Sequence, residues 1–160
     1  MIRKYIPFIG TIALLTILLS SCDNSVIYRE KKEIKSPYWT YADSVRFDFD
    51  IKDTSKLYSL ELDVIHSDTF PSENCYVRIL SKYPNDTLKS DVLSLEFADQ
   101  NGLWMGKAHG DDYLVPIALQ PVAKFKIPGK YSMTFLQNNR IDSLPGIRSM
   151  EMYIHILSKK

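Results

Sequence analysis

The sequence has little of the chemistry on which enzymes and metal sites depend. It contains two cysteines and three histidines, and no histidine stands in a recognised metal-binding spacing with a second His or Cys. It has no Gly-x-Ser-x-Gly nucleophile motif and no glycine-rich phosphate-binding loop. We therefore expect a protein that is not an enzyme and that holds neither a cofactor nor a metal.

An excess of charge of one sign is also missing. The chain has 20 Lys and Arg against 19 Asp and Glu, a net charge of +1. Its basic clusters are the pairs Lys31-Lys32 and Lys159-Lys160, which lie near the ends of the chain. A protein that binds nucleic acid needs a concentrated basic surface, so the composition excludes nucleic acid as a partner.

No hydrophobic run is long enough to cross a bilayer. The longest, from Ile6 to Leu19, holds 14 residues, whereas a spanning helix needs about 20. It follows Arg3 and Lys4 and ends in Leu19-Ser20-Ser21-Cys22. A basic start, a short apolar segment and small residues before a cysteine are typical of a bacterial lipoprotein signal. We expect residues 1–21 to be removed and Cys22 to carry fatty-acyl chains such as palmitate, which would anchor the chain in a membrane.

The remaining 139 residues fit one domain with one core. We divide them into a lipidated tether, residues 22–36, which contributes at most one edge strand, and a single domain, residues 37–160. With Cys22 lipidated, Cys75 is the only thiol and no disulfide can form. Cys75 shares its strand parity with Val77 and Ile79, so we expect it in the core.

The domain shows the two-residue alternation of strands and no helical period. Val45, Phe47, Phe49 and Ile51 alternate with charged residues, which is the clearest strand in the chain. Further strands are predicted over residues 58–66, 75–82, 88–97, 114–119, 131–135 and 148–157, with Pro116 placing one of them at a sheet edge. Such strands predict an all-β, antiparallel two-sheet β-sandwich, Ig-like or jelly-roll-like. A small closed barrel is the alternative, because it needs the same alternation.

Aromatic residues suggest one functional hypothesis. Tyr38, Trp39 and Tyr41 precede the first clear strand, and Trp104 lies in a glycine-rich segment. Such rings stack on sugars, which makes a glycan-binding module the alternative function. The competing interpretation is that Trp39 and Trp104 close the ends of the core, because large aromatic side chains are usually buried.

A third possibility concerns His109, Asp111 and Asp112. A histidine followed by two acids in a loop can ligate a metal or take part in hydrolysis. It is also the composition of a solvated polar turn, which we favour.

Several segments in this order resemble the GldH gliding-motility lipoproteins of Bacteroidetes. They are the Ser-Ser-Cys22 signal, Tyr38-Trp39 before the strand at 45–49, residues 98–107 continuing to Gly110-Asp111, and the turn at residues 142–147. Together they cover nearly the whole mature chain.

The resemblance implies a lipoprotein of the gliding apparatus, associated with the outer membrane and linked to type IX secretion, with no known enzymatic activity. The expected partners are membrane lipid, through acylated Cys22, and other envelope, motility or secretion proteins. We expect the contact surface among residues of two turns, whose alternative role is turn geometry: Trp104, Gly106, Lys107, Gly110, Asp111, Leu144, Pro145 and Gly146.

Overall fold

The structure is a computed structural model of the 160-residue chain, and it describes residues 25–35 and 37–157. All regular elements of the described residues are strands: β1 (Val26–Glu33), β2 (Tyr38–Trp39), β3 (Val45–Ile51), β4 (Leu57–Ser67), β5 (Asn74–Lys82), β6 (Leu88–Glu96), β7 (Lys107–His109), β8 (Asp112–Ala123), β9 (Gly129–Gln137), β10 (Leu144–Pro145) and β11 (Ile147–Leu157). Within that part of the chain, no helix is long and apolar enough to span a membrane. The signal at residues 1–21 and Cys22 lie outside the described residues.

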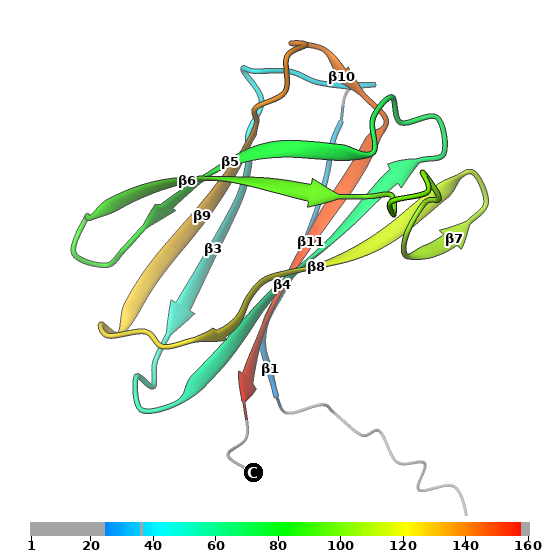
Figure 1. The fold of residues 1–160 in the computed structure, drawn as a ribbon. Coiled ribbons are helices and arrows are strands. Elements are labelled where there is room, and N and C mark those ends of the chain that lie inside the picture. The colour runs from blue at the N-terminus through cyan, green and yellow to red at the C-terminus, as the bar shows by residue number, and fades with distance from the viewer. Residues whose placement is uncertain (1–24, 36, 158–160) are drawn as a thin grey trace, which may run out of the picture.

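Two antiparallel sheets face each other and form a β-sandwich, which confirms the predicted fold class (Figure 1). One sheet has the strand order β1-β11-β4-β8-β7, and the other has the order β3-β9-β5-β6. The short strands β2 and β10 form a separate pair at one end. The sheets do not close on each other, so the barrel alternative is not realised.

The alternation in β3 shows why the sequence forms this core. Val45, Phe47, Phe49 and Ile51 are buried, and the residues between them are exposed. Phe47 packs edge-on against Phe135 of β9, with ring centroids 5.9 Å apart. In β3, one face is therefore buried in the core and the other faces water. Cys75 is fully buried beside Val77, as predicted, and burial raises the pKa of its thiol to about 11.

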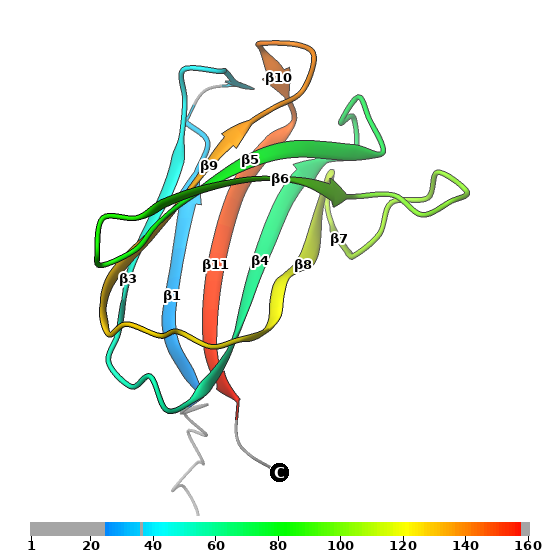
Figure 2. The same cartoon turned by 60° about the vertical axis from the view of Figure 1, so that its left-hand side comes forward.

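The segment before the clear strands is part of the larger sheet. β1 is its edge strand and pairs with β11 from Val26↔His155 to Glu33↔Ser149. The pairing begins at Ser25, whose carbonyl oxygen accepts a hydrogen bond from the Ile156 amide at 2.7 Å. Eight residues of the expected tether therefore lie in the sandwich, as its edge strand (Figure 2).

Pro116 lies on the outer part of β8, as its missing N–H requires. β7 pairs with β8 only between Asp112 and Leu114, so β8 is an edge of the larger sheet beyond that point. Its register with β4 shifts at Leu60. The prediction that this segment forms an edge or bulged strand is confirmed.

The sandwich has two ends with different contents. The start of β1, the end of β11 and the connections β3–β4 and β8–β9 lie at one end, which we call the anchor end (Figure 1). The connections β4–β5 and β7–β8 lie at the opposite end, which we call the loop end. β4 runs between them with 11 residues, so the two ends are about 33 Å apart.

Candidate interaction site at the loop end

A buried histidine lies at the centre of the loop end. The His66 side chain is fully buried, and its ring stacks on Phe97 with centroids 4.6 Å apart and 15° between the planes. Tyr113 is stacked at 5.8 Å, Trp104 is edge-on at 4.9 Å and Phe70 is tilted at 5.8 Å. These five residues, His66, Phe70, Phe97, Trp104 and Tyr113, form an aromatic cluster that joins β4, β8 and the loops around them.

The hydrogen bonding of His66 fixes its tautomer. Nδ1 lies 2.8 Å from the Ser67 carbonyl oxygen, and because a carbonyl only accepts, Nδ1 carries the proton. Nε2 is buried and has no hydrogen-bond partner among the described residues. Burial lowers the pKa of His66, opposed by its bond to Ser67 and by the charge of Asp112. The ring is therefore neutral near pH 7.

The loop after β4 connects the two turns that the sequence analysis identified as contact candidates. The Ser67 amide donates to the Gly146 carbonyl oxygen at 2.8 Å, and the Asp68 amide donates to the Asp111 carbonyl oxygen at 2.8 Å. Trp104 Nε1 donates to the Asp68 carbonyl oxygen at 3.2 Å. The structure thus brings both turns together, on either side of residues 67–70.

The segment before Trp104 is shaped by the Asp99 carboxylate. Asp99 Oδ1 accepts the amides of Asn101 at 2.8 Å and Leu103 at 3.0 Å. These two bonds lower the pKa of Asp99 and hold a tight loop. A bridge between Ala98 and Trp104 closes the loop. Leu103, whose carbonyl oxygen accepts the Asp99 amide at 2.9 Å, has 66% of its surface exposed.

Two glycines shape the β7–β8 hairpin. Gly110 is the first of two residues between paired His109 and Asp112, and its φ of +61° is what a two-residue type II′ turn requires. Gly106 has a φ of +83°, and a Cβ placed there would lie 2.1 Å from the Leu114 carbonyl oxygen. Only glycine fits at position 106.

The eight contact candidates differ in their access to solvent. Gly106, Lys107, Gly110 and Asp111 are exposed, while Trp104 and Pro145 are half-buried. Leu144 and Gly146 are buried, and Gly146, with a φ of +86°, lies against Ser67 and Phe70. Leu144 and Gly146 therefore fit the alternative role, that of shaping the turn. The exposed residues of the hairpin are accessible to a partner.

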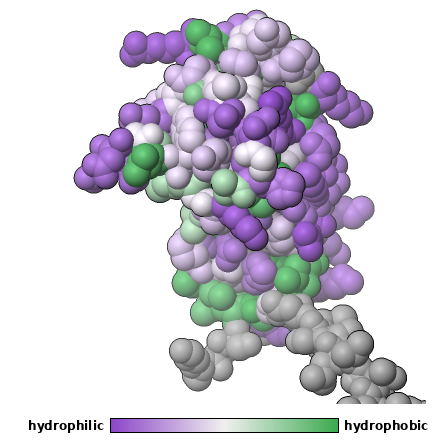
Figure 3. All heavy atoms as spheres, turned by 90° about the vertical axis from the view of Figure 1, so that its right-hand side faces the viewer, coloured by the Kyte–Doolittle hydropathy of each residue, from purple (hydrophilic) through white to green (hydrophobic). Residues whose placement is uncertain are grey.

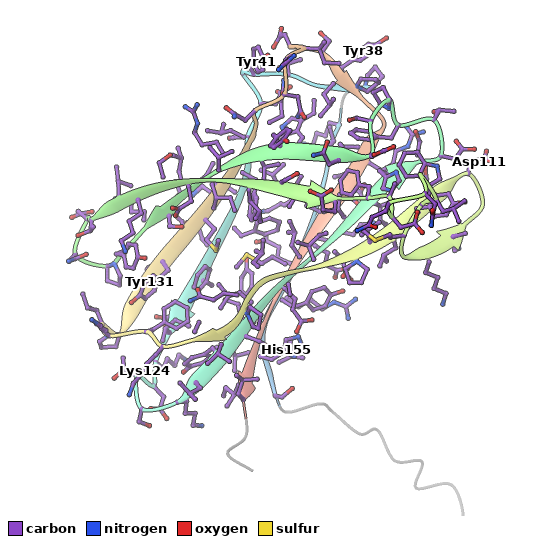
Figure 4. All side chains as sticks on the ribbon, viewed as in Figure 1. Tyr38, Tyr41, Asp111, Lys124, Tyr131 and His155 are labelled. Atoms are coloured by element: carbon purple, nitrogen blue, oxygen red, sulfur yellow. The ribbon has the colours of Figure 1, made fainter. Side chains whose placement is uncertain are left out.

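The four residues of the glycan hypothesis do not share one face. Trp39 is fully buried and donates from Nε1 to the Asp43 carbonyl oxygen at 3.3 Å, so it closes the core as predicted. Tyr38 and Tyr41 lie at the β2–β10 corner, away from the hairpin that carries Asp111 (Figure 4). Trp104 belongs to the aromatic cluster. Trp39 therefore offers no ring face to a sugar.

The acids of the hairpin are not assembled as metal ligands. Asp112 Oδ1 accepts from Arg148 Nε at 3.2 Å, and Asp111 is exposed. Among residues 25–35 and 37–157, no group of three His, Cys, Asp or Glu side chains is placed to hold a metal ion. The geometry of this segment is that of a polar hairpin turn.

Sequence reasoning missed the two residues that define this site most clearly, His66 and Leu103. The signal for His66 was present, since it continues the buried parity of Leu60, Leu62 and Val64 in β4. The signal for Leu103 was its place directly after Asp99-Gln100-Asn101-Gly102, because a turn sequence is typical of a surface segment.

The fold and this site define a small two-sheet β-sandwich that displays a preorganised pair of loops at one end. Residues 26–154 match the GldH lipoprotein family, and the chain therefore belongs to that family. A gliding motility lipoprotein GldH homolog of Christiangramia forsetii is 30% identical over 136 residues, covering 84% of this chain and 83% of its own. The gliding motility lipoprotein GldH of Flavobacterium johnsoniae is 29% identical over 143 residues, covering 89% and 88%. Family membership confirms the resemblance and makes the chain a lipid-anchored protein of the cell envelope.

Solved structures resemble this chain only loosely. A family 35 carbohydrate binding module from Clostridium thermocellum covers 79% of this chain and 88% of its own, with 12% identity and a TM-score of 0.36. The VP2 subviral particle of infectious bursal disease virus covers 80% of this chain and 32% of its own, with 16% identity and a TM-score of 0.34. Likeness at this level carries no argument about function.

Proposed function

We propose that this chain is a non-enzymatic subunit of the gliding-motility apparatus, held at the outer membrane by lipid on Cys22, which binds another envelope protein through its loop end. The relatives in Christiangramia forsetii and Flavobacterium johnsoniae are named for gliding motility. The signal ending at Cys22 supplies the anchor, since several acyl chains in a bilayer make attachment effectively permanent.

The observation that carries the binding part of the proposal is the convergence of the two turns on residues 67–70. Hydrogen bonds from Ser67 to Gly146 and from Asp68 to Asp111 fix the loop between them. The aromatic cluster beneath holds Trp104 and Tyr113. A surface fixed before binding loses little conformational entropy on binding, which favours recognition of a folded partner.

The exposed residues of the loop end have the composition of a protein contact. Leu103 supplies an apolar side chain in solvent, and the exposed Lys107 and Asp111 of the β7–β8 hairpin supply charges of both signs. An apolar centre within a polar rim is the usual anatomy of a protein interface. The position about 33 Å from the anchor end keeps these residues clear of the bilayer surface.

The test is chemical crosslinking in native envelopes followed by purification of the tagged chain. We expect specific envelope proteins to be recovered with the unaltered chain and lost with Leu103→Asp. The matched control is Leu88→Asp, because Leu88 is 69% exposed but lies in the β5–β6 hairpin. Recovery of the same proteins with both variants would contradict the proposed surface, and recovery of polysaccharide alone would favour the glycan-binding alternative.

A further inference from the structure

Ser25 is the first described residue of the sandwich. It lies in the same row across the larger sheet as the start of a lysine-rich segment. The Ser25 carbonyl oxygen accepts from the Ile156 amide. Ile156 pairs with Tyr58, and Tyr58 pairs with Ala123 at the end of β8. Lys124 follows directly. Three strand spacings separate β1 from β8, so Lys124 lies about 14 Å across the sheet from Ser25, at the same height.

The segment from Cys22 to Ser25 is too short to hold this row far from a membrane. Three residues lead from Cys22 to Ser25, and an extended chain spans at most about 3.6 Å per residue. If Cys22 is acylated, the anchor end is held within about 11 Å of the bilayer surface. An acylated Cys22 would therefore keep the anchor end within reach of lipid headgroups.

Lysines are concentrated at the anchor end. The β3–β4 connection carries Lys52 and Lys56, the β8–β9 connection carries Lys124 and Lys126, and Lys130 is the second residue of β9. Among the described residues, Asp50 and Asp53 are the carboxylates in and beside the β3–β4 connection, and Asp53 lies 3.7 Å from Lys56 Nζ. Asp48 and Asp86 line a separate hollow with Lys130. The chain is nearly neutral as a whole, so this excess is local.

Two of these lysines border a hollow that has no acid in its lining. The hollow, about 330 Å³ in volume, is lined by Lys89, Lys124 and Lys126 together with aromatic, amide, hydroxyl and aliphatic side chains, and no Asp or Glu of the described residues lines it. Lys124 and Lys126 form no ion pair with any described residue. Figure 4 shows Lys124 and Tyr131 on this side of the anchor end.

The floor of the hollow is rigid. The Phe125 ring packs edge-on against Tyr131 at 4.9 Å and against Tyr58 at 5.4 Å. The Tyr131 hydroxyl donates to the Ile127 carbonyl oxygen at 2.6 Å. These contacts pin the backbone between Lys124 and Lys126, so both ammonium groups are displayed from a fixed segment.

Apolar side chains adjoin the lysines. Leu57 is 36% exposed and Val122 is 60% exposed. The space-filling view from the right-hand side of Figure 1 shows hydrophobic residues at the lower end of the molecule on that side too (Figure 3). Lysine heads beside apolar side chains are the composition of surfaces that rest on the headgroup region of a membrane.

We propose that the anchor end is a docking surface for anionic phospholipid, with a headgroup phosphate held between Lys124 and Lys126. This inference rests on the proposed lipidation of Cys22 and extends it. The acyl chains hold the molecule at the bilayer, and the lysines set its orientation, so that the loop end points away from the membrane.

The test uses the full mature, acylated protein in nanodiscs of phosphatidylcholine, with or without phosphatidylglycerol. A fluorophore is attached at Ser55→Cys in the β3–β4 connection, and its quenching by a nitroxide on lipid headgroups reports docking. The buried Cys75, with its pKa raised to about 11, stays unlabelled. We expect strong quenching only with phosphatidylglycerol, and a loss of that quenching at high salt.

Substitutions identify the residues involved. Each of Lys124→Gln and Lys126→Gln should lower the ratio of docked to undocked molecules about fivefold, and both together about 25-fold. Lys107→Gln at the loop end is the matched control and should change nothing. Quenching that is equal in both lipid mixtures, or unaffected by the double variant, would overturn the proposal.

Two further readouts separate the possible failures. Mass spectrometry of the nanodisc sample establishes acylation of Cys22, so an acylated but undocked chain contradicts the docking surface and leaves the anchor intact. A chain without acyl groups contradicts the anchor itself. Binding of soluble glycerol phosphate at Lys124 and Lys126, without docking to nanodiscs, would assign the hollow to a soluble phosphate and overturn the lipid assignment.

Discussion

The imidazole ring of His66 stacks on the phenyl ring of Phe97, with centroids 4.6 Å apart and planes 15° from parallel. His66 belongs to β4 of the larger sheet, and Phe97 directly follows β6 of the smaller sheet. This contact therefore joins the two sheets beneath the loops that we propose as the binding surface.

The neutral state of His66 makes stability depend on pH. Burial holds the pKa of His66 below its ordinary value of 6.5, so the unfolded chain takes up a proton at a higher pH than the folded chain. The stabilisation is fully present above pH 6.5 and is lost as the pH falls through the lower folded pKa. Urea unfolding between pH 7.5 and 5 should show this decline in the free energy of unfolding.

The variant His66→Phe should flatten that pH dependence, because the phenyl ring keeps the stacking and has no proton to gain. His109→Phe is the control, since His109 is exposed in β7, and it should leave the decline in place. A decline of equal size in His66→Phe would show that another group is responsible.

Gly106 should tolerate no side chain. A Cβ at this position would lie 2.1 Å from the Leu114 carbonyl oxygen, in a backbone conformation with a φ of +83°. We expect Gly106→Ala to lower the free energy of unfolding by about 2 to 4 kcal/mol.

Gly110→Ala is the matched comparison, because Gly110 also has a positive φ but no atom lies within 4 Å of the added Cβ. Its expected cost is about 1 kcal/mol. Equal melting temperatures for the two variants would contradict the close packing of Gly106 on β8.

Asn139 extends the β5–β9 ladder with its side chain. Its Oδ1 accepts from the Tyr76 amide at 3.0 Å, and its Nδ2 donates to the Tyr76 carbonyl oxygen at 3.1 Å. Asn139→Ala leaves the Tyr76 amide without this partner, while the Tyr76 carbonyl oxygen still accepts from the Asn138 amide at 2.8 Å, so the substitution should cost about 1 kcal/mol. Asn138→Ala, which removes one exposed bond to Arg78, should stay within about 0.5 kcal/mol. Thermal unfolding followed by circular dichroism compares them, and a larger loss in Asn138→Ala would refute this role.

Acylation should depend on Cys22 alone. Cells grown with labelled palmitate should transfer the label to the unaltered chain and to Cys75→Ala, because the Cys75 thiol is buried. Cys22→Ala should carry none and should leave the membrane fraction or retain its signal. Label in Cys22→Ala would show that another residue carries the lipid.

The alternation of apolar and polar residues was enough to predict the strands and most of the core. Val45 to Ile51 and Cys75 lie where their alternation placed them, because one face of each of these strands had to be buried. The same alternation suits many strand orders, and the order β1-β11-β4-β8 pairs segments more than 100 residues apart, from Val26 to His155. Local patterns carry no information about such pairings.

The candidate site was predictable in part. The sequence identified the two turns as candidates. Their contact with residues 67–70 depends on hydrogen bonds such as the one from Ser67 to Gly146, and these bonds form only because of the order of the strands. Gly146 is buried there against Ser67 and Phe70. His66 is a polar residue at a strand position where the alternation predicts a buried side chain. That pattern would have located the centre of the site.

The most direct test of the account is site-specific photocrosslinking in living cells from position 103 of the acylated chain. We expect a photoreactive residue in place of Leu103, which is 66% exposed at the loop end, to give a discrete protein adduct in the envelope. The same residue in place of Leu57 at the anchor end should give lipid adducts instead. A protein adduct from position 57 with none from position 103 would contradict the account.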